Sequence, residues 1–230
     1  MRTQRAGNTG VGKTLEDLLG IRENNFPGPD GAMVELKSTR KTATSMVSLF
    51  TKSPLPKSAN TELVREYGYL TPKSRNERKM LHTTVSAVDY NTLRRKVGFK
   101  IDIGESRIEL VVRDLHGESL NDFERPPKGE TEDRKVMGYW DKETLKSAFE
   151  KKLPKVLFVR ADSRGSGDQE EFWYNEASLL SGFSFEGFLT LLRDGKILTD
   201  VRIGQYPDGR GHDHGTCFRV RQAKDRKSVV

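Results

Sequence analysis

Hydrophobic and polar residues alternate along several short segments of the chain, as in strands that are buried on one face. These segments cover residues 32–38, 46–51, 99–103, 107–115, 156–161, 198–204 and 214–221. Apolar residues recur at helical spacing in three others, at residues 14–19, 141–153 and 184–194. The last two strand patterns are joined by a loop containing Asp208 and Gly209, which favours a hairpin. The order of elements predicts an α/β fold of the α+β kind, a mixed sheet with flanking helices.

Composition narrows the class of protein without fixing its function. The 230 residues are 34% hydrophobic and 32% charged, which is typical of a polar globular protein. We find no apolar run long enough to span a bilayer and no signal-peptide pattern. The single cysteine, Cys217, excludes an internal disulfide and fits a reducing, cytoplasmic location. A net charge of +7 permits a nucleic-acid partner, but an ordinary basic protein would also carry it.

The segment from Gly7 to Thr14 matches the phosphate-binding P-loop pattern. That pattern requires a buried strand before it, and the six preceding residues, MRTQRA, are polar. A P-loop ATPase is therefore a remote alternative. The competing interpretation makes Thr14 the N-cap of a short helix, with Asp17 completing a capping box. On that helix Glu16 lies at the edge of the apolar stripe and can reach the surface that the helix packs against.

A second constellation follows, in which Asp30 precedes a strand pattern that carries Glu35 and Lys37. Side chains two apart on a strand share a face, so two carboxylates and an ammonium would meet at a sheet edge. Oxygen ligands of this kind suit Mg²⁺, which can activate water against a phosphate. The competing interpretation is a solvated strand face, because Glu-x-Lys recurs at Glu77–Lys79 and Glu150–Lys152.

The C-terminal hairpin carries polar side chains suited to reading bases. Asp200 and Arg202 share a strand face, and His212, His214 and Arg219 follow on the return strand. Arginine can bind guanine with two hydrogen bonds, and aspartate can accept one from cytosine. Alternatively, Arg219 pairs with Asp200 as strand charges often do, or the two histidines bind a metal, although no further His or Cys cluster supports zinc.

These motifs together resemble the MvaI/BcnI restriction endonucleases, a family of PD-(D/E)xK nucleases related to the nicking enzyme MutH. The resemblance rests on GNTGVGKTLEDLLG with PDGAMVELK, on LFTKSP, and on DVRIGQYPDGRGHDHGTCFRV, in one order along the chain. It is stronger toward the MvaI branch. It implies a PD-(D/E)xK core, with a catalytic part in residues 1–110 and the remaining fold with the DNA-recognition region in residues 111–230, or else one continuous domain.

The resemblance also implies roles for individual residues. Asp30 and Glu35 correspond to the metal-binding carboxylates, Lys37 to the catalytic lysine, and Glu16 to a supporting acidic residue of the active site. The cofactor would be Mg²⁺, with one or two ions left open, and no nucleotide. Residues expected to contact DNA are Asp200, Arg202, Tyr206, His212, His214, Arg219, His82 and Lys52.

The implied activity is that of a type II restriction endonuclease acting on double-stranded DNA at a CC-N-GG-like site, with CCWGG favoured over CCSGG. A monomer that cuts one strand at a time is expected, together with a methyltransferase that protects host DNA. The family has an additional segment before the glycine loop, whereas six residues precede Gly7 here. A catalytically impaired DNA-binding relative therefore stays open as an alternative. A MutH-like nickase is a further alternative.

Overall fold

The computed structural model describes residues 1–21, 34–72, 74, 78–94, 97–114 and 134–221. The chain divides into two compact units. The first combines Met1–Val47, Ala148–Phe185 and Arg221–Val230, and the second combines Ser48–Ser147 and Glu186–Val220. The expected division after residue 110 falls inside the second unit, because the chain leaves the first unit early and returns to it later.

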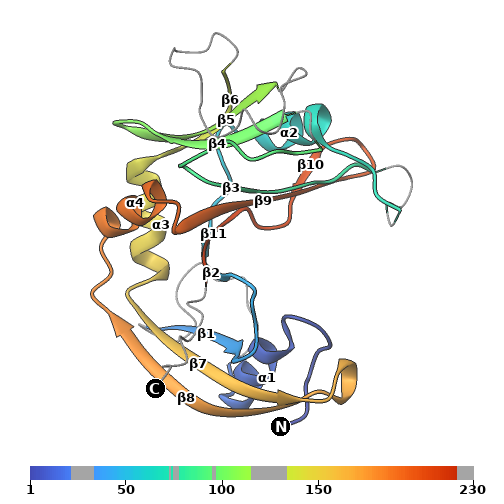
Figure 1. Ribbon diagram of the computed structural model, residues 1–230, viewed down its shortest axis with the longest axis vertical. Helices are drawn as coiled ribbons and strands as arrows, with labels where there is room; N and C mark the ends of the chain where they lie inside the picture. Colours follow the sequence, from blue (N-terminus) through green and yellow to red (C-terminus); the bar gives the residue numbers. More distant parts are fainter. Residues whose placement is uncertain (22–33, 73, 75–77, 95–96, 115–133, 222–230) are drawn as a thin grey trace, which may run out of the picture. The chain divides into compact units, whose positions relative to one another are not determined.

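The first unit contains a mixed three-stranded sheet, in the order β1, β7, β8 (Figure 1). Its strands are β1 (Glu35–Arg40), β7 (Lys155–Arg164) and β8 (Glu171–Ser181). β1 runs parallel to β7, so that Glu35 lies opposite Val156, and β8 is antiparallel to β7. The predicted mixed sheet is thus present. β8 was not predicted, because most of its side chains are exposed and it shows no alternating burial.

Helix α1 (Gly10–Leu18) packs on this sheet through Val11, which joins Ala161 and Phe172 in a buried apolar cluster. The Tyr174 hydroxyl donates a hydrogen bond to the Val11 carbonyl at 2.7 Å. The helix begins earlier than the sequence predicted, with Thr9 as its N-cap residue. The N-cap role predicted for Thr14 was therefore wrong: Thr14 is buried inside the helix.

The glycine segment does not have P-loop geometry. Over residues 1–21, which the structure describes, the only β pairing is an isolated bridge from Arg2 to Glu171, so no strand leads into the loop. Lys13, which would hold a phosphate, pairs with Asp17 at 2.6 Å. The Thr14 hydroxyl accepts a hydrogen bond from the Gln4 amide at 3.0 Å. The second of these contacts ties the N-terminal segment to α1, and Gly10 lets the same segment pack closely against the helix.

The second unit contains two further sheets, one of five strands and one of three. In the larger sheet β9 pairs antiparallel with β3, β10 and β11, and β2 lies next to β11 (Figure 1). The smaller sheet is the antiparallel series β4, β5, β6. The strand bounds are β2 Val47–Thr51, β3 Leu81–Val85, β4 Val97–Ile103, β5 Arg107–Asp114, β6 Lys135–Asp141, β9 Ile197–Gln205, β10 Gly211–Asp213 and β11 Cys217–Val220.

The predicted C-terminal hairpin is present, and its return strand is divided into β10 and β11. Gly209, with φ +87°, is in the turn, where a left-handed backbone suits glycine. Helices α3 (Lys142–Lys152) and α4 (Phe185–Arg193) lie where the sequence predicted them, whereas α2 (Ala59–Tyr67) was not predicted.

Aromatic rings form the centre of the second unit's core. The Phe218 ring lies 5.1 Å from Phe50, 5.3 Å from Phe188 and 5.6 Å from Trp140, measured between centroids. The Trp140 indole N–H also donates to the Lys52 carbonyl at 2.9 Å. Since Phe218 faces inward, its strand neighbour Arg219 faces the other side of the sheet, as the alternation predicted. None of the helices in the described parts of the chain is both long and apolar enough to cross a membrane.

The fold predicts different outcomes for two glycines of α1. A Cβ at Gly10 would lie 2.2 Å from the Arg5 carbonyl oxygen, whereas one at Gly12 would lie 3.7 Å from the Ser38 hydroxyl. We expect Gly10→Ala to lower the free energy of unfolding by about 1–3 kcal/mol through overpacking. The matched Gly12→Ala should be neutral, or stabilising by up to about 1 kcal/mol, because alanine favours helix. Denaturant unfolding of both variants measures this, and equal stability would contradict the packing.

Candidate functional site

Glu35 and Lys37 form a close ion pair on β1. The Lys37 ammonium donates to Glu35 Oε1 at 2.5 Å, so the two side chains share a strand face as predicted. Glu35 is 1% exposed, while the Lys37 side chain is 21% exposed. A buried carboxylate is costly without partners. Its position at the start of β1 therefore depends on nearby cations.

A second cation, Lys152, approaches the other oxygen of the same carboxylate. Its ammonium lies 2.9 Å from Glu35 Oε2. The angle does not make a hydrogen bond, and Oε2 is a buried oxygen with no hydrogen-bond partner. We take the 2.9 Å separation as an ion pair, since charge attraction does not require alignment. This role of Lys152 was not predicted, because its nearest acidic residue in the sequence is Glu150, from which it diverges on a helix.

The fold explains how residues so distant in sequence meet. Lys152 is the last residue of α3, and β7 starts three residues later at Lys155. β7 pairs in parallel with β1, and Val156 is the register partner of Glu35. The end of α3 is therefore delivered to the end of β1 where Glu35 lies. All of these residues except the start of α3 belong to the first unit.

The oxygen chemistry at Glu35 fits a hard divalent cation. Glu35 Oε2 is buried and makes no hydrogen bond, so it keeps electron pairs that a metal could use. Asp30, the other expected metal ligand, lies outside the described residues. Across the described ranges no group of three His, Cys, Asp or Glu side chains is arranged to hold a metal. The structure therefore provides one fitting ligand, Glu35, while the role of Asp30 stays a prediction.

Glu16 lies on α1, and its side chain is half-buried. The same helix places Gly12 against Ser38, which points to the opposite face of β1 from Glu35 and Lys37. The structure thus brings Glu35, Lys37 and Lys152 together and places Glu16 on the helix that packs against the other face of the strand. A supporting role for Glu16 stays a prediction.

Two cations at the end of β1, Arg40 and Lys41, are paired with acidic side chains. Arg40 makes two hydrogen bonds to Glu170, at 2.6 and 2.5 Å, and one to the Gly7 carbonyl at 2.9 Å. Glu170 holds the pKa of Arg40 above its ordinary value through these hydrogen bonds. Lys41 pairs with Glu176 at 2.7 Å. Through these contacts, Arg40 connects the glycine loop to β1.

The second predicted site lies on β9 and its neighbouring strands, in the second unit. Asp200 is 4% exposed, and its carboxylate binds three side chains. Arg202 donates a hydrogen bond to it at 2.7 Å and the Thr84 hydroxyl donates one at 3.0 Å, while the Arg219 guanidinium forms an ion pair with it at 3.0 Å. The predicted alternative in which Arg219 pairs with Asp200 is thus present. Asp200 holds two arginines, and the 43% exposed side chain of Arg202 extends to solvent.

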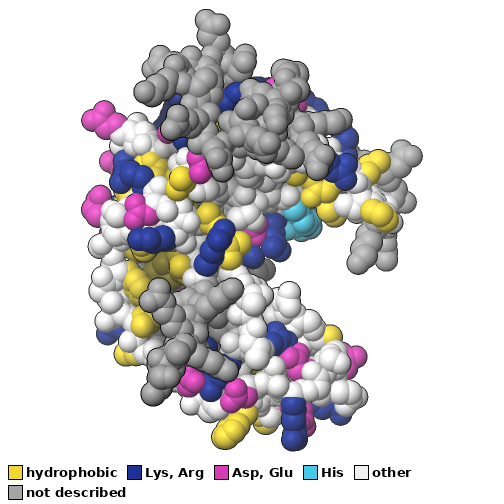
Figure 2. Space-filling model, viewed as in Figure 1, with side chains coloured by type: hydrophobic (Ala, Val, Ile, Leu, Met, Phe, Trp, Pro, Cys, Tyr) yellow, Lys and Arg dark blue, Asp and Glu magenta, His cyan; other side chains and the backbone are white. Residues whose placement is uncertain are grey.

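Three rings form a row beside these arginines. The Tyr206 and His212 centroids are 4.6 Å apart, and those of His212 and His214 are 4.4 Å apart. A Cβ at Gly204 would lie 2.4 Å from His214 Nε2, so this glycine leaves room for the imidazole. Figure 2 shows histidine side chains gathered on the surface next to Lys or Arg side chains. The predicted polar residues of the hairpin are thus neighbours in space.

Two imidazoles of this group have a pKa below the ordinary value. For His82, which lies opposite Arg202 in the β3–β9 register, loss of surrounding water is the largest cause. The positive charge of Arg202 acts in the same direction. For His214 the causes are loss of water and then the neighbouring His212. Both shifts favour the neutral ring, which can donate and accept hydrogen bonds.

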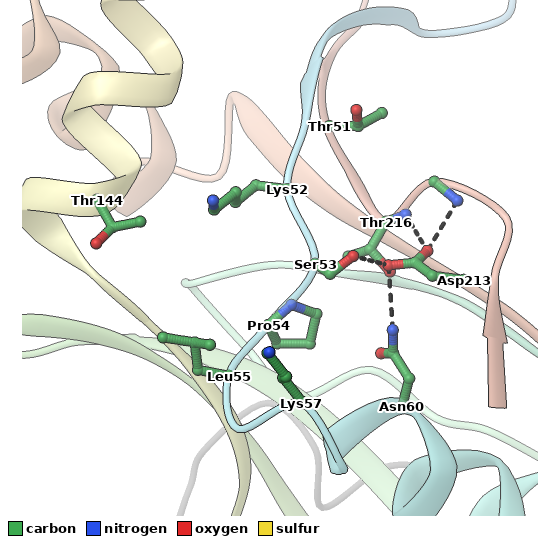
Figure 3. Close-up of a pocket in the computed structure, with 11 residues that line it drawn as sticks. Thr51, Lys52, Ser53, Pro54, Leu55, Lys57, Asn60, Thr144, Asp213 and Thr216 are labelled. Carbon is green, nitrogen blue, oxygen red and sulfur yellow. Dashed lines mark hydrogen bonds between the residues drawn. The ribbon is translucent and has the colours of Figure 1, made fainter. Parts of the chain in front are cut away.

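Lys52 lines a pocket of about 540 Å³ together with Thr144, Lys57 and the turn after β10. Figure 3 shows its side chain extending from the segment after β2 toward Thr144 on α3. On the far side of the pocket, Asp213 accepts hydrogen bonds that close the turn. They come from Ser53 Oγ at 2.5 Å, Asn60 Nδ2 at 3.1 Å, and the amides of Gly215 at 2.8 Å and Thr216 at 2.7 Å.

Asp213 was not predicted, although it stands between the two histidines in the sequence. Its four hydrogen bonds fix the turn from β10 to β11 and therefore the spacing of His212 and His214. The Asp-x-Gly-Thr spacing, in which one carboxylate bonds amides two and three residues ahead, is a turn signal that could have identified it.

Comparison with known proteins identifies the family of the chain. The model of the MvaI/BcnI restriction endonuclease family matches residues 1–227. A solved structure of restriction endonuclease MvaI in complex with its cognate DNA substrate is 33% identical, with a TM-score of 0.79; the match covers 96% of this chain and 86% of that one. MvaI in the absence of DNA is 32% identical, with a TM-score of 0.57 and the same coverage. No curated protein matches the chain. The chain therefore belongs to the MvaI/BcnI restriction endonuclease family and is a DNA endonuclease with the fold of MvaI.

Proposed function

We propose that this endonuclease requires Mg²⁺ and hydrolyses both strands of double-stranded DNA at a CC-N-GG-like site, with CCWGG favoured. The observation that carries the proposal is the buried Glu35 carboxylate. Its Oε1 accepts a hydrogen bond from the Lys37 ammonium, and its Oε2 has no hydrogen bond. The similarity to MvaI with its DNA substrate supports the target class.

In the proposed mechanism Glu35 and Asp30 hold the metal. Bound Mg²⁺ would supply a polarised phosphate and a water of lowered pKa. Lys37, which is partly exposed and held at a fixed place by Glu35, orients the attacking water and offsets charge on the phosphoryl oxygens. Glu16 supports the site from the first helix.

Recognition is assigned to the second unit. We propose that Arg202 and Arg219 contact guanines. We also propose that Asp200 orients both arginines, because each guanidinium lies against its Oδ2. His212, His214, His82 and Tyr206 would read or flank the neighbouring bases, and Lys52 would contact a phosphate, which sets register without reading sequence. The enzyme would act as a monomer beside a protective methyltransferase.

Replacing Glu35 by glutamine tests the catalytic assignment. We expect cleavage to fall by about a hundredfold or more, because the side chain keeps its shape and loses the charge that a metal needs. Lys37→Met should behave alike. Binding to a duplex that contains the target, measured by fluorescence anisotropy without metal, should be largely retained. Glu105→Gln, on an exposed turn, is the matched control. Full cleavage by the Glu35 variant would rule out this site.

Replacing Arg202 tests the reading of bases. Arg202→Ala should weaken binding to the target by about 1–3 kcal/mol, the value of a bidentate guanine contact, with little effect on random DNA. Arg210→Ala removes another exposed arginine of the same hairpin and should change both affinities by similar amounts. Titrations of each variant with both duplexes give the comparison. Equal weakening of the Arg202 variant on random DNA would argue against base reading.

A further inference from the structure

Two positive charges face one buried carboxylate in the first unit. Lys37 and Lys152 approach opposite oxygens of Glu35, at 2.5 and 2.9 Å. The two contacts differ in kind. Lys37 makes an aligned hydrogen bond from the neighbouring position on the same strand face, whereas Lys152 is at contact distance without alignment. Lys152 is therefore the weaker partner of the two.

Lys152 faces Glu35 Oε2, the carboxylate oxygen whose lone pairs accept no hydrogen bond. Glu35 Oε2 is buried and lacks a hydrogen bond, which makes it the oxygen that a metal would take. An ammonium and a divalent cation that lie against the same oxygen repel each other, so binding of the metal favours withdrawal of the ammonium. The Lys152 side chain is 24% exposed, and its ammonium is carried by a flexible four-carbon chain, so the ammonium can move toward water.

We propose that Lys152 is a positioning residue that holds the metal-facing oxygen of Glu35 until a divalent cation displaces its ammonium. The inference rests on the proposed function, in which Glu35 binds metal. In the metal-free enzyme Lys152 keeps this oxygen of the buried carboxylate paired. Because the ammonium must be displaced, it lowers the affinity for the metal. It assigns to Lys152 a role in metal affinity that is separate from the role of Lys37 in the reaction.

Binding of Mn²⁺ alone tests the exchange without any measurement of cleavage. Free Mn²⁺ is counted by electron paramagnetic resonance in titrations of the full chain without DNA. Lys152→Met should bind Mn²⁺ about fivefold more tightly, because no ammonium has to be displaced; the factor is that of an ion pair of about 1 kcal/mol. Lys151→Met is the matched control, with the same charge lost one residue away on α3, and should not show this gain.

The conservative variant provides the rescue. Lys152→Arg restores a cation beside Glu35 and should return the Mn²⁺ affinity to within about twofold of the unsubstituted protein, since the pair is partly exposed. Thermal unfolding checks that each variant is folded, and Lys152→Gln replaces the methionine variant if that one is not. An affinity of the Met or Gln variant equal to that of Lys151→Met would overturn the proposal.

A second readout follows the ammonium itself in the unsubstituted protein. Acetylation of lysines, quantified by mass spectrometry, should modify Lys152 severalfold faster with saturating Mn²⁺ than without it, while Lys151 stays unchanged. Equal rates at Lys152 in both conditions would overturn the exchange.

Glu35→Gln separates this proposal from the proposed function. If the glutamine variant binds Mn²⁺ as tightly as the unsubstituted protein, the metal site at Glu35 is wrong and the proposed function loses its basis. If that variant loses Mn²⁺ while the Lys152 variants bind it unchanged, the metal site stands and only the role of Lys152 is refuted.

Discussion

The burial of one carboxylate, Glu35, is the constraint on which the proposed catalytic region depends. An acidic side chain with 1% exposure is tolerated only where the fold supplies cations, and here two lysines do so from different elements. Lys37 comes with the strand itself. Lys152 requires that α3 end beside β1, which the parallel pairing of β1 with β7 brings about. The sheet of the first unit is thus built around the same group that the proposed chemistry uses.

The proposed recognition region follows the same rule, a buried acid with two cations. Asp200 is the buried acid, and Arg202 and Arg219 are the cations that it holds. An arginine fixed by a buried carboxylate loses less rotational freedom on binding than a free one, which favours specific contacts. Asp213 has a similar orienting role in the turn after β10, where its hydrogen bonds set the positions of two histidines. In both units a buried or bonded acid orients the groups to which the proposed function assigns contact with DNA.

The sequence predicted local features of these sites well. The shared face of Glu35 and Lys37, the shared face of Asp200 and Arg202, and the C-terminal hairpin all follow from strand alternation and turn chemistry. The roles that escaped prediction depend on contacts between distant segments. Lys152 meets Glu35 only through strand pairing, and the fixation of Arg40 by Glu170 needs residues far apart in the chain. Thr14 was misplaced because a glycine-rich start does not reveal that the N-terminal segment packs against it.

The central claim is that Glu35 and Lys37 cut DNA at a site read by the second unit. Its most direct test is digestion of long unmethylated DNA with the purified protein and Mg²⁺, without nucleotide, followed by sequencing of the fragment ends. The account predicts discrete fragments whose ends all derive from one CC-N-GG-like sequence, with both strands cut and with no cleavage when the metal is chelated. Ends without a common sequence, or cleavage that persists without metal, would contradict it.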